Sequence, residues 1–333
     1  RAATRSVLLD VVQVGDKYWA VGDHGNILVT NEAALEKFVK AEKAELAKPI
    51  DDRKEIWGNT VWQQVNVPVR SALTAVYFAD EQNGWAVGYD AAIVATKDGG
   101  KTWVKQFYQF KDPNGAMPQM ILHDIACTDA NTCMAVGAFG LLITTVDGGN
   151  TWTSQPGPFV AEGSHLHAIT KLDDGGVVIV GERGLIALTR DAGATWKKVQ
   201  SDYQGTYFFA LPNGPSGLLV GGLQGNAYTL ADINTAPTSD FAAPGTEETA
   251  EATTEESAPE AAAPADAAST DAVATDAVAA TPTLWTKIDT QVDISLLGGS
   301  RTSDGGAIVT GFNGLTLRFS AGMASAQLVK NPV

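Results

Sequence analysis

The stretch TVDGGNTW at residues 145–152 decides the fold, because it recurs as TKDGGKTW at 96–103 and as TRDAGATW at 189–196. The aspartate in each copy can accept hydrogen bonds from the backbone N–H groups of a turn, and the glycines permit left-handed turn conformations. The tryptophan that ends each copy is large enough to fill the space between two packed sheets. We therefore predict structural roles, and no catalytic role, for Asp98, Trp103, Asp147, Trp152, Asp191 and Trp196.

Each motif ends a longer repeat, and the three clearest repeats cover residues 73–106, 122–155 and 166–200. Each repeat reads as four short strands, here called a to d, with a Val-Gly pair near the end of strand b in the best copies and the tryptophan in strand d. Weaker copies begin at residues 8, 207 and 294. The glycines that mark strand b are Gly22, Gly88, Gly137, Gly181, Gly221 and Gly311.

Repeats of about 44 residues with four antiparallel strands cannot bury their faces alone, and they stack radially around a channel. The sequence therefore predicts an all-β fold, a β-propeller that occupies residues 1–333 as a single domain. Six repeats are visible, which predicts six blades, and seven is the alternative if a terminus holds a further partial blade.

Two insertions lengthen the connection between strands c and d. Residues 33–56 in the first repeat have apolar residues at helical spacing among Glu and Lys, with Asn31 as an N-cap, which predicts a helix. The apolar side of this helix packs either on the propeller rim or on a partner. Residues 236–282 in the fifth repeat hold ten carboxylates with no Lys, Arg or His, and this composition predicts disorder.

The net charge of −15 is therefore unevenly distributed, since residues 236–282 carry two thirds of it. A chain this acidic repels a phosphate backbone, so nucleic acid is excluded as a partner. No apolar run approaches the roughly 20 residues that a membrane helix needs, so we predict no direct membrane span. The sequence begins at Arg1 and not at Met, which leads us to expect a processed chain, exported after removal of a signal.

The two cysteines, Cys127 and Cys133, flank a short turn between two strand-like runs. Their side chains can face each other across a hairpin, which predicts a disulfide. Two buried, inert thiols are the alternative.

The repeated motif matches the Asp-box, or BNR, pattern, and it occurs here together with WAVG at residues 85–88 and AVG at 135–137. The chain thereby resembles the Ycf48/HCF136-like family of exported Asp-box propellers over all but its two insertions. The resemblance implies a noncatalytic propeller that binds membrane proteins, and the photosynthetic members act as photosystem II assembly factors. Those members have seven blades and an arginine-rich surface patch. Here only Arg5, Arg70 and Arg183 are placed near one face, which favours a divergent, non-photosynthetic bacterial member.

We therefore expect a periplasmic or otherwise exported factor for the assembly, stability or function of an envelope membrane complex. The expected partner is a membrane protein or a subunit of such a complex, and a transporter is one candidate. The resemblance and the motifs imply no enzyme activity and no cofactor.

Two other functions are alternatives to a protein-binding propeller. Asp boxes also occur in sialidases, but those enzymes need an arginine triad and a Tyr/Glu pair, and this chain has eight arginines and no Arg-Ile-Pro motif. A propeller that binds a small ligand or a metal is the other alternative, with His123, His165 and His167 at positions where three imidazoles could approach one another.

The partner surface is expected on the face that carries the b–c turns and the d–a connections. Loops on a rigid scaffold commonly carry binding, and these loops are unusually apolar. The alternative is that the apolar side chains fill the central channel. The candidate residues are Tyr89, Phe107, Tyr108, Phe110, Phe139, Phe159, Arg183 and Phe312.

Overall fold

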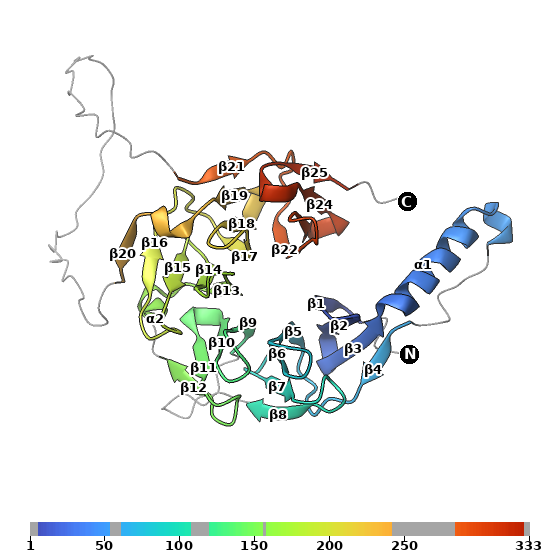
Figure 1. Cartoon of the computed structure of the whole chain (residues 1–333), viewed down its shortest axis with the longest axis horizontal. Coiled ribbons are helices and arrows are strands. Elements are labelled where there is room, and N and C mark those ends of the chain that lie inside the picture. Colours follow the sequence, from blue (N-terminus) through green and yellow to red (C-terminus); the bar gives the residue numbers. More distant parts are fainter. Residues whose placement is uncertain (1–5, 54–60, 108–119, 156–157, 242–283, 330–333) are drawn as a thin grey trace, which may run out of the picture.

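The computed structural model describes residues 6–53, 61–107, 120–155, 158–241 and 284–329. Within these residues the strands form six antiparallel sheets that surround a channel (Figure 1), so the six predicted blades are confirmed. Strand a of each blade lies at the channel and strand d lies at the rim. The turns that join a to b and c to d therefore share one face of the propeller, and the b–c turns share the other.

The strands of the first three blades are β1 (Leu8–Val14), β2 (Lys17–Gly22), β3 (Asn26–Asn31) and β4 (Gln63–Val65); β5 (Leu73–Phe78), β6 (Gly84–Gly88), β7 (Ile93–Thr96) and β8 (Val104–Phe107); β9 (Leu122–Cys127), β10 (Cys133–Gly137), β11 (Leu142–Thr145) and β12 (Thr153–Gln155). Those of the last three are β13 (Leu166–Lys171), β14 (Val177–Gly181), β15 (Ile186–Thr189), β16 (Lys197–Val199) and β20 (Thr238–Asp240); β17 (Tyr207–Pro212), β18 (Leu218–Gly222), β19 (Ala227–Leu230) and β21 (Thr286–Ile288); β22 (Leu296–Arg301), β23 (Ala307–Gly311), β24 (Thr316–Phe319) and β25 (Ala326–Leu328).

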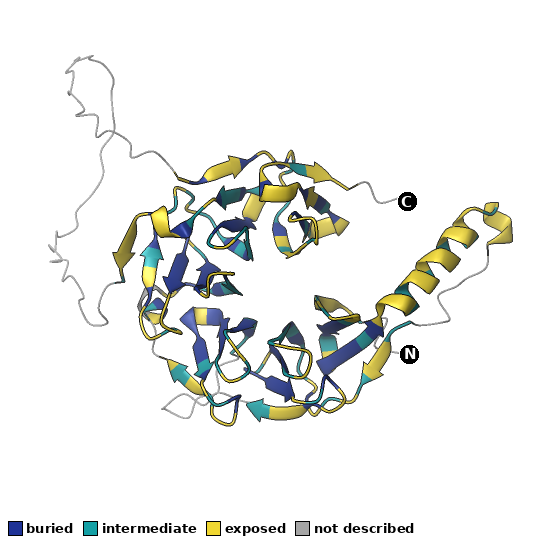
Figure 2. Ribbon diagram, in the orientation of Figure 1, coloured by how far each residue is buried: buried dark blue, intermediate teal, exposed yellow. Residues whose placement is uncertain are grey.

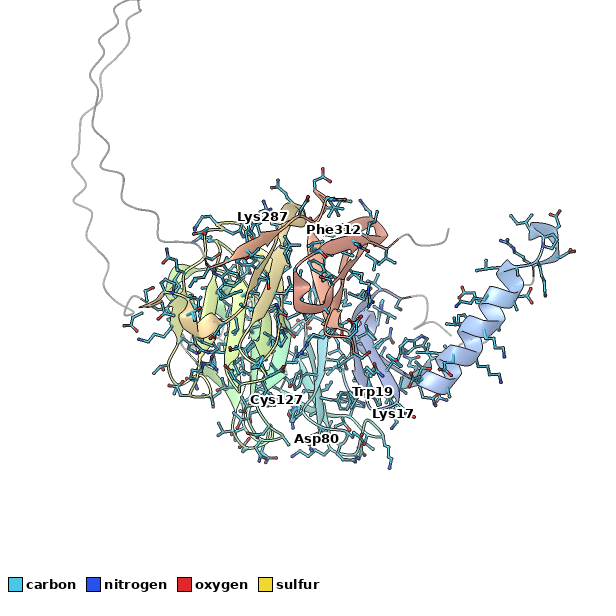
Figure 3. All side chains as sticks on the ribbon, turned by 45° about the horizontal axis from the view of Figure 1, so that its top comes forward. Lys17, Trp19, Asp80, Cys127, Lys287 and Phe312 are labelled. Atoms are coloured by element: carbon cyan, nitrogen blue, oxygen red, sulfur yellow. A yellow bond between two sulfur atoms is a disulfide. The ribbon has the colours of Figure 1, made fainter. Side chains whose placement is uncertain are left out.

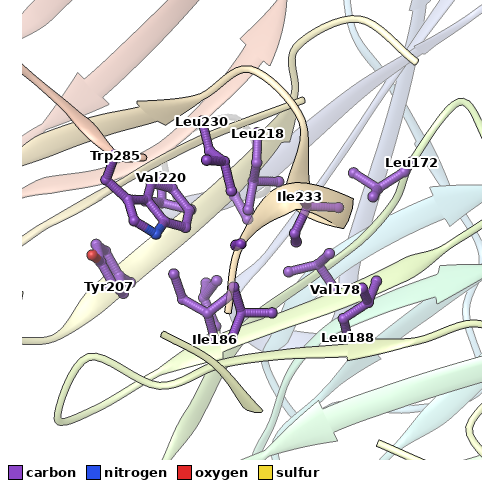
Figure 4. Packing of buried hydrophobic residues seen from close by; sticks show 14 of the residues in the cluster. Leu172, Val178, Ile186, Leu188, Tyr207, Leu218, Val220, Leu230, Ile233 and Trp285 are labelled. Atoms are coloured by element: carbon purple, nitrogen blue, oxygen red, sulfur yellow. The ribbon is translucent and has the colours of Figure 1, made fainter. Parts of the chain in front are cut away.

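Successive blades are held together by hydrophobic side chains. The b strands of blades 2 to 5 are buried along their whole length, because both of their faces contact neighbouring blades (Figure 2). Five apolar clusters join blades 1 and 2, 2 and 3, 3 and 4, 4 and 5, and 5 and 6. Figure 4 shows the cluster between blades 4 and 5, where Trp285 lies beside Val220 and Tyr207.

As formed by the described residues, the ring is open between the last blade and the first. Figure 1 shows β22 and β1 at the two ends of the ring. None of the apolar clusters formed by the described residues combines side chains of blades 6 and 1. The sixth junction therefore differs from the other five.

The helical insertion begins where strand c of blade 1 ends. Helix α1 (Glu32–Leu46) is capped by the side chain of Asn31, whose Oδ1 accepts a hydrogen bond of 2.8 Å from the backbone N–H of Ala34. A short 3-10 turn, η3 (Ile50–Asp52), follows. The helix projects from blade 1 and none of its residues is buried (Figures 1 and 3).

The first residues of the acidic insertion, for which the composition predicts disorder, form a strand. Residues 236–241 are ordered, because β20 pairs with β16 and adds a fifth strand to blade 4. This strand follows the short turn η6 (Ile233–Thr235), in which Ile233 is buried between blades 4 and 5. The remaining residues of the predicted segment, 242–282, lie outside the described part of the chain.

The predicted disulfide between Cys127 and Cys133 is confirmed. The two residues lie directly opposite each other in the pairing of β9 with β10, with a Cα–Cα distance of 4.0 Å. Both side chains are buried in the junction between blades 2 and 3. The bond therefore closes the a–b hairpin of blade 3 from within the core.

The three Asp-box motifs form identical turns. In the fourth blade, Asp191 Oδ1 accepts hydrogen bonds from the Thr195 backbone N–H (2.8 Å) and the Thr189 hydroxyl (2.7 Å), and Oδ2 accepts one from the Thr195 hydroxyl (2.6 Å). Asp98 and Asp147 make the same three contacts in blades 2 and 3. These hydrogen bonds hold the pKa of each carboxyl below its usual range.

We expect the substitution Asp191→Ala to lower the free energy of unfolding by about 1–2 kcal/mol, because it removes three hydrogen bonds from one turn. Urea unfolding at pH 7 measures this change. The matched substitution Asp16→Ala removes an exposed carboxylate from the turn between β1 and β2 and should change the free energy by less than about 0.5 kcal/mol. Equal effects of the two substitutions would contradict a structural role for Asp191.

Candidate functional site

Six b–c turns gather on one face of the propeller. Four of them are the 3-10 turns η2 (Asp23–Gly25), η4 (Ala138–Gly140), η5 (Leu223–Gly225) and η7 (Phe312–Gly314), and blades 2 and 4 turn at residues 89–92 and 182–185. Figure 3 shows Phe312 at one end of the molecule and Asp80, in an a–b turn, at the other. Every b–c turn contains a side-chain-bearing residue with a left-handed φ between 54° and 60°: His24, Asp90, Phe139, Arg183, Gln224 and Asn313. In blade 2 the next residue, Ala91, is left-handed as well, with φ 50°.

Left-handed backbone is unfavourable for residues with a Cβ atom, by about 1–2 kcal/mol for most of them. His, Asp and Asn tolerate it best, whereas Phe139, Arg183 and Gln224 are residues that rarely adopt it. Glycine would remove the strain at these positions. Strained backbone repeated on one face is typical of a functional surface. The repeat pattern did not predict this conformation.

The turns are held on rigid supports by one repeated hydrogen bond. In blade 3 the backbone N–H of Ala138 donates to the carbonyl of Ile121, just before strand a, over 2.9 Å. The corresponding bond occurs in the other five blades and measures 2.9–3.3 Å. Each turn is thereby fixed to the start of strand a of its own blade. The side chains of the six left-handed residues therefore have defined positions.

Three aromatic side chains of this face are exposed. Tyr89, Phe139 and Phe312 expose 45%, 60% and 55% of their surface. The ring of Phe139 contacts that of His165 with centroids 4.7 Å apart, and its backbone N–H donates to His165 Nδ1. Exposed aromatic residues in a polar surround are the commonest anchors of protein interfaces. The predicted residues Tyr89, Phe139, Arg183 and Phe312 therefore lie on the same face.

The residues predicted from the d–a connections lie elsewhere. Phe107 ends β8, where it is half-buried against the junction of blades 2 and 3. Tyr108 and Phe110 lie outside the described residues.

Phe159 is wrong as a candidate for the partner surface, because its side chain is fully buried. The short helix α2 (Phe159–Glu162) inserts this ring between blades 3 and 4, where it contacts Trp196 at 5.4 Å and Phe241 at 5.2 Å between ring centroids. The connection therefore uses its apolar residue to complete a blade junction and not to fill the channel.

The three predicted histidines lie close together, and two of them, His123 and His167, line a cavity in the channel. The rings of His123 and His167 stack with centroids 5.2 Å apart, and His165 lies 6.3–6.4 Å from both. A ring nitrogen of His123 is already engaged with the carbonyl oxygen of Leu166 at 2.8 Å. Burial lowers the pKa of His167 to about 4. In the part of the chain that the structure describes, no group of three His, Cys, Asp or Glu residues could hold a metal ion.

Two aspartates beside the channel were not singled out from the sequence. Asp124 Oδ1 accepts a hydrogen bond from Ile125 N–H and its Oδ2 accepts one from Ile169 N–H in the next blade, over 2.9 Å. Asp10 makes the same pair of contacts and thereby joins blade 1 to Val76 of blade 2. Burial raises the pKa of both carboxyls, that of Asp124 to about 7. The two residues border a central cavity of about 390 Å³.

The arginines of the described residues do not gather around a common point of the channel. Arg190, Arg301 and Arg318 form ion pairs with Asp174, Asp173 and Asp304, which lie in a–b turns. These three side chains are therefore engaged on the face opposite the b–c turns. The geometry offers surfaces for contact with another molecule, formed by aromatic and strained turn residues.

Comparison with known proteins gives a consistent picture of the family. A family model described as "Photosynthesis system II assembly factor YCF48" matches residues 55–117 and 116–224, just over half of the chain. A photosystem II stability/assembly factor, HCF136, of Guillardia theta is 39% identical over 57 residues, which are 16% of this chain and 14% of that protein. The photosystem II assembly protein Ycf48 of Thermosynechococcus vestitus is 36% identical over 42 residues, 13% of this chain and 12% of that protein. The matches therefore span less than a sixth of these relatives.

Solved structures share the fold at low identity. A structure described as Ycf48 bound to a D1 peptide has a TM-score of 0.51 and 17% identity, with 81% of this chain and 73% of that chain covered. Ycf48 from Cyanidioschyzon merolae has a TM-score of 0.57 and 13% identity, with 98% and 85% covered. At these identities the likeness supports the propeller fold alone.

Proposed function

Because the chain belongs to the Ycf48 family of photosystem II assembly-factor-like propellers, we propose that it is a noncatalytic binding protein for a membrane protein complex. Its client is a membrane protein or a subunit of an envelope complex, such as a transporter, and the propeller assists the assembly, stability or activity of that complex. No helix in the described residues is long and apolar enough to cross a bilayer.

The observation that carries this proposal is the face of the b–c turns. Six rigidly held turns each present a side chain from a left-handed residue, and Tyr89, Phe139 and Phe312 add exposed aromatic surface. A relative of known structure is described as bound to a D1 peptide, which supports recognition of a peptide segment as the mode of binding. The buried disulfide supports an exported location, since disulfides persist in oxidising compartments.

The test is the capture of a client from envelope membranes by chemical crosslinking and affinity purification. The variant with Phe139→Ser and Phe312→Ser should enrich the client at least about 30-fold less than the wild type, because the loss of even one aromatic anchor worth about 2 kcal/mol corresponds to this factor. The matched variant Val146→Ser, whose side chain is exposed in an Asp-box turn on the opposite face, should retain full enrichment. Equal enrichment by all three proteins would contradict the choice of face, and no enriched membrane protein would contradict the function.

A further inference from the structure

The open junction leaves part of the apolar side of blade 1 exposed. In blades 2 to 5 the first and fourth residues of strand a pack on the preceding blade and expose at most 6% of their surface, as in Leu73 and Val76 of blade 2. The first residue of the inner strand in blade 6, Leu296, is equally buried. The same two positions in blade 1 are Leu8 and Val11, which are 43% and 55% exposed. The positions are equivalent because Leu8, like Leu73, pairs with the glycine that ends strand b.

Leu8 and Val11 are the exposed residues of an apolar side of blade 1, here called the junction face. Behind them Ala20 and Leu28 are buried beneath Trp62, the counterpart of the inter-blade tryptophans. The residue types are those that fill the other junctions, so the face is built to be covered. Five junctions of this molecule show what covers such a face, namely an antiparallel sheet with large apolar side chains in its b and c strands.

The opposite side of the opening does not provide these side chains. In β23 and β24, Val309 and Leu317 face blade 5. The residues next to them in each strand face the opening, and these are Ile308, Thr310, Thr316 and Arg318. Thr310 and Arg318 are exposed and Arg318 pairs with Asp304, so blade 6 presents a largely polar face. A polar outer face is typical of the unit that ends a series of stacked repeats. The element that fills the junction therefore needs one apolar and one polar side.

A second copy of the chain cannot fill the opening with its own junction face. The other side of blade 1 is already covered by blade 2, through Trp19 and Val21. Blade 1 of a second copy would therefore bring its blade 2 into the space beside blade 6. A thinner element is required. The b and c strands of blade 1 show what a two-stranded element can supply, because Trp19, Val21 and Ile27 of these strands pack on blade 2.

We propose that the junction face binds an amphipathic β-hairpin of the client protein, which docks between blades 1 and 6. This inference rests on the proposed function, since it assumes that the propeller has a client. The hairpin places Trp-, Val- or Ile-sized side chains on Leu8 and Val11 and polar side chains toward blade 6. Sheets that pack face to face lie about 10 Å apart, which sets the thickness of the element.

The first part of the test asks whether the junction face is accessible. Both natural cysteines are joined in the disulfide, so the variants Val11→Cys and Val76→Cys each carry a single thiol at equivalent positions of blades 1 and 2. A maleimide reagent should modify the first at least about 100-fold faster than the second, because the second reacts only after local opening. Equally slow reactions would overturn the proposal, because the chain would then cover its own junction face.

The second part uses a surrogate for the client hairpin. Residues 17–31 form the hairpin of β2 and β3, whose Trp19, Val21 and Ile27 cover the equivalent face of blade 2. A backbone-cyclised peptide of this sequence should slow the labelling of the Val11→Cys variant about 10-fold in a saturable manner. In the Val11→Cys variant, a second substitution Leu8→Asp should abolish this protection. The control substitution Val104→Asp in the same variant, at an exposed apolar residue of the rim, should leave the protection intact. Absence of protection by the peptide would overturn the proposal.

The last part separates this inference from the proposed function. The client captured from envelope membranes should protect the thiol of the Val11→Cys variant as the peptide does. A captured client that leaves this thiol reactive would overturn the inference and leave the proposed function standing. If no client is captured, the proposed function fails, and the inference fails with it because the junction would then have no client hairpin to bind.

Discussion

Replacing Gly137 with alanine is expected to lower the free energy of unfolding by about 3 kcal/mol or more. A Cβ atom on Gly137 would lie 2.0 Å from the carbonyl oxygen of Ile121 and 2.9 Å from the Cα of Leu122, both of which are backbone. The same carbonyl accepts the hydrogen bond from Ala138 that fixes the b–c turn. The methyl group therefore displaces the inner strand, breaks this bond and loosens two blade junctions.

The corresponding glycines of the other blades make equally close contacts with the carbonyl that precedes strand a, at 1.9–2.5 Å: Gly22, Gly88, Gly181, Gly222 and Gly311. The substitution Gly298→Ala in β22 is the matched control, because no atom lies within 4 Å of its added Cβ. We expect it to change the free energy by less than about 1 kcal/mol. Thermal unfolding followed by circular dichroism distinguishes the two variants, with a lower Tm for Gly137→Ala by about 6 °C or more. Equal Tm values would contradict the close approach.

The same glycines show what the sequence could reveal and what it could not. Their recurrence identified strand b and hence the number of blades, because the contact behind it is local and is repeated in each blade. The register was predicted correctly in five blades, but in blade 5 the equivalent residue is Gly222 and not Gly221, since Tyr207 pairs with Gly222. Gly221 and Gly222 are adjacent, so the repeat pattern alone does not show which of them ends strand b. The pairing of strand b with strand a identifies Gly222.

Features that depend on contacts between blades were not predictable in this way. Phe159 reads as a loop residue, and its burial depends on the space between Trp196 and Phe241, which come from distant segments. The exposure of Leu8 and Val11 depends on what lies beside the first blade, and the repeat pattern contains no such information. The left-handed turn residues were also missed, because glycine, which would indicate this conformation, does not occupy their position. In five blades glycine follows the left-handed residue in the chain, and in blade 2 Ala91 follows Asp90.

The sequence of strand a does contain one signal from which a contact between blades could have been predicted. Its third residue is apolar or Gly in four blades but aspartate in blades 1 and 3, and an acidic residue at a packed position requires partners. The structure supplies them as backbone N–H groups of the next blade, for Asp10 and for Asp124. This placement leads to the prediction for pH.

The substitution Asp124→Asn is expected to change the pH dependence of stability. Burial raises the pKa of Asp124 from 3.8 to about 7, with a further contribution from the charge of Asp10. Between pH 3.8 and about pH 7 the Asp124 carboxyl is deprotonated in the unfolded chain and protonated in the folded protein. The contribution of Asp124 to stability is therefore full below pH 3.8 and is lost as the pH rises through about 7. A shift of this size corresponds to about 4 kcal/mol, of which about 2–3 kcal/mol remains after screening by water in the channel.

Comparison of the variant with the wild type is essential, because His167 acts in the opposite direction. Its pKa is lowered to about 4, so its contribution to stability is lost as the pH falls from 6.5 toward 4, and the two effects partly cancel in the wild type. The destabilisation caused by Asp124→Asn, measured by urea unfolding, should therefore be largest near pH 4 and should decrease by about 2–3 kcal/mol up to pH 8. The substitution Asp191→Asn removes a carboxyl whose pKa is lowered by hydrogen bonds from Thr195, so its effect should stay nearly constant over this range. A constant effect of Asp124→Asn as well would show that the carboxylate that joins blades 3 and 4 is ionised in the folded protein at pH 4.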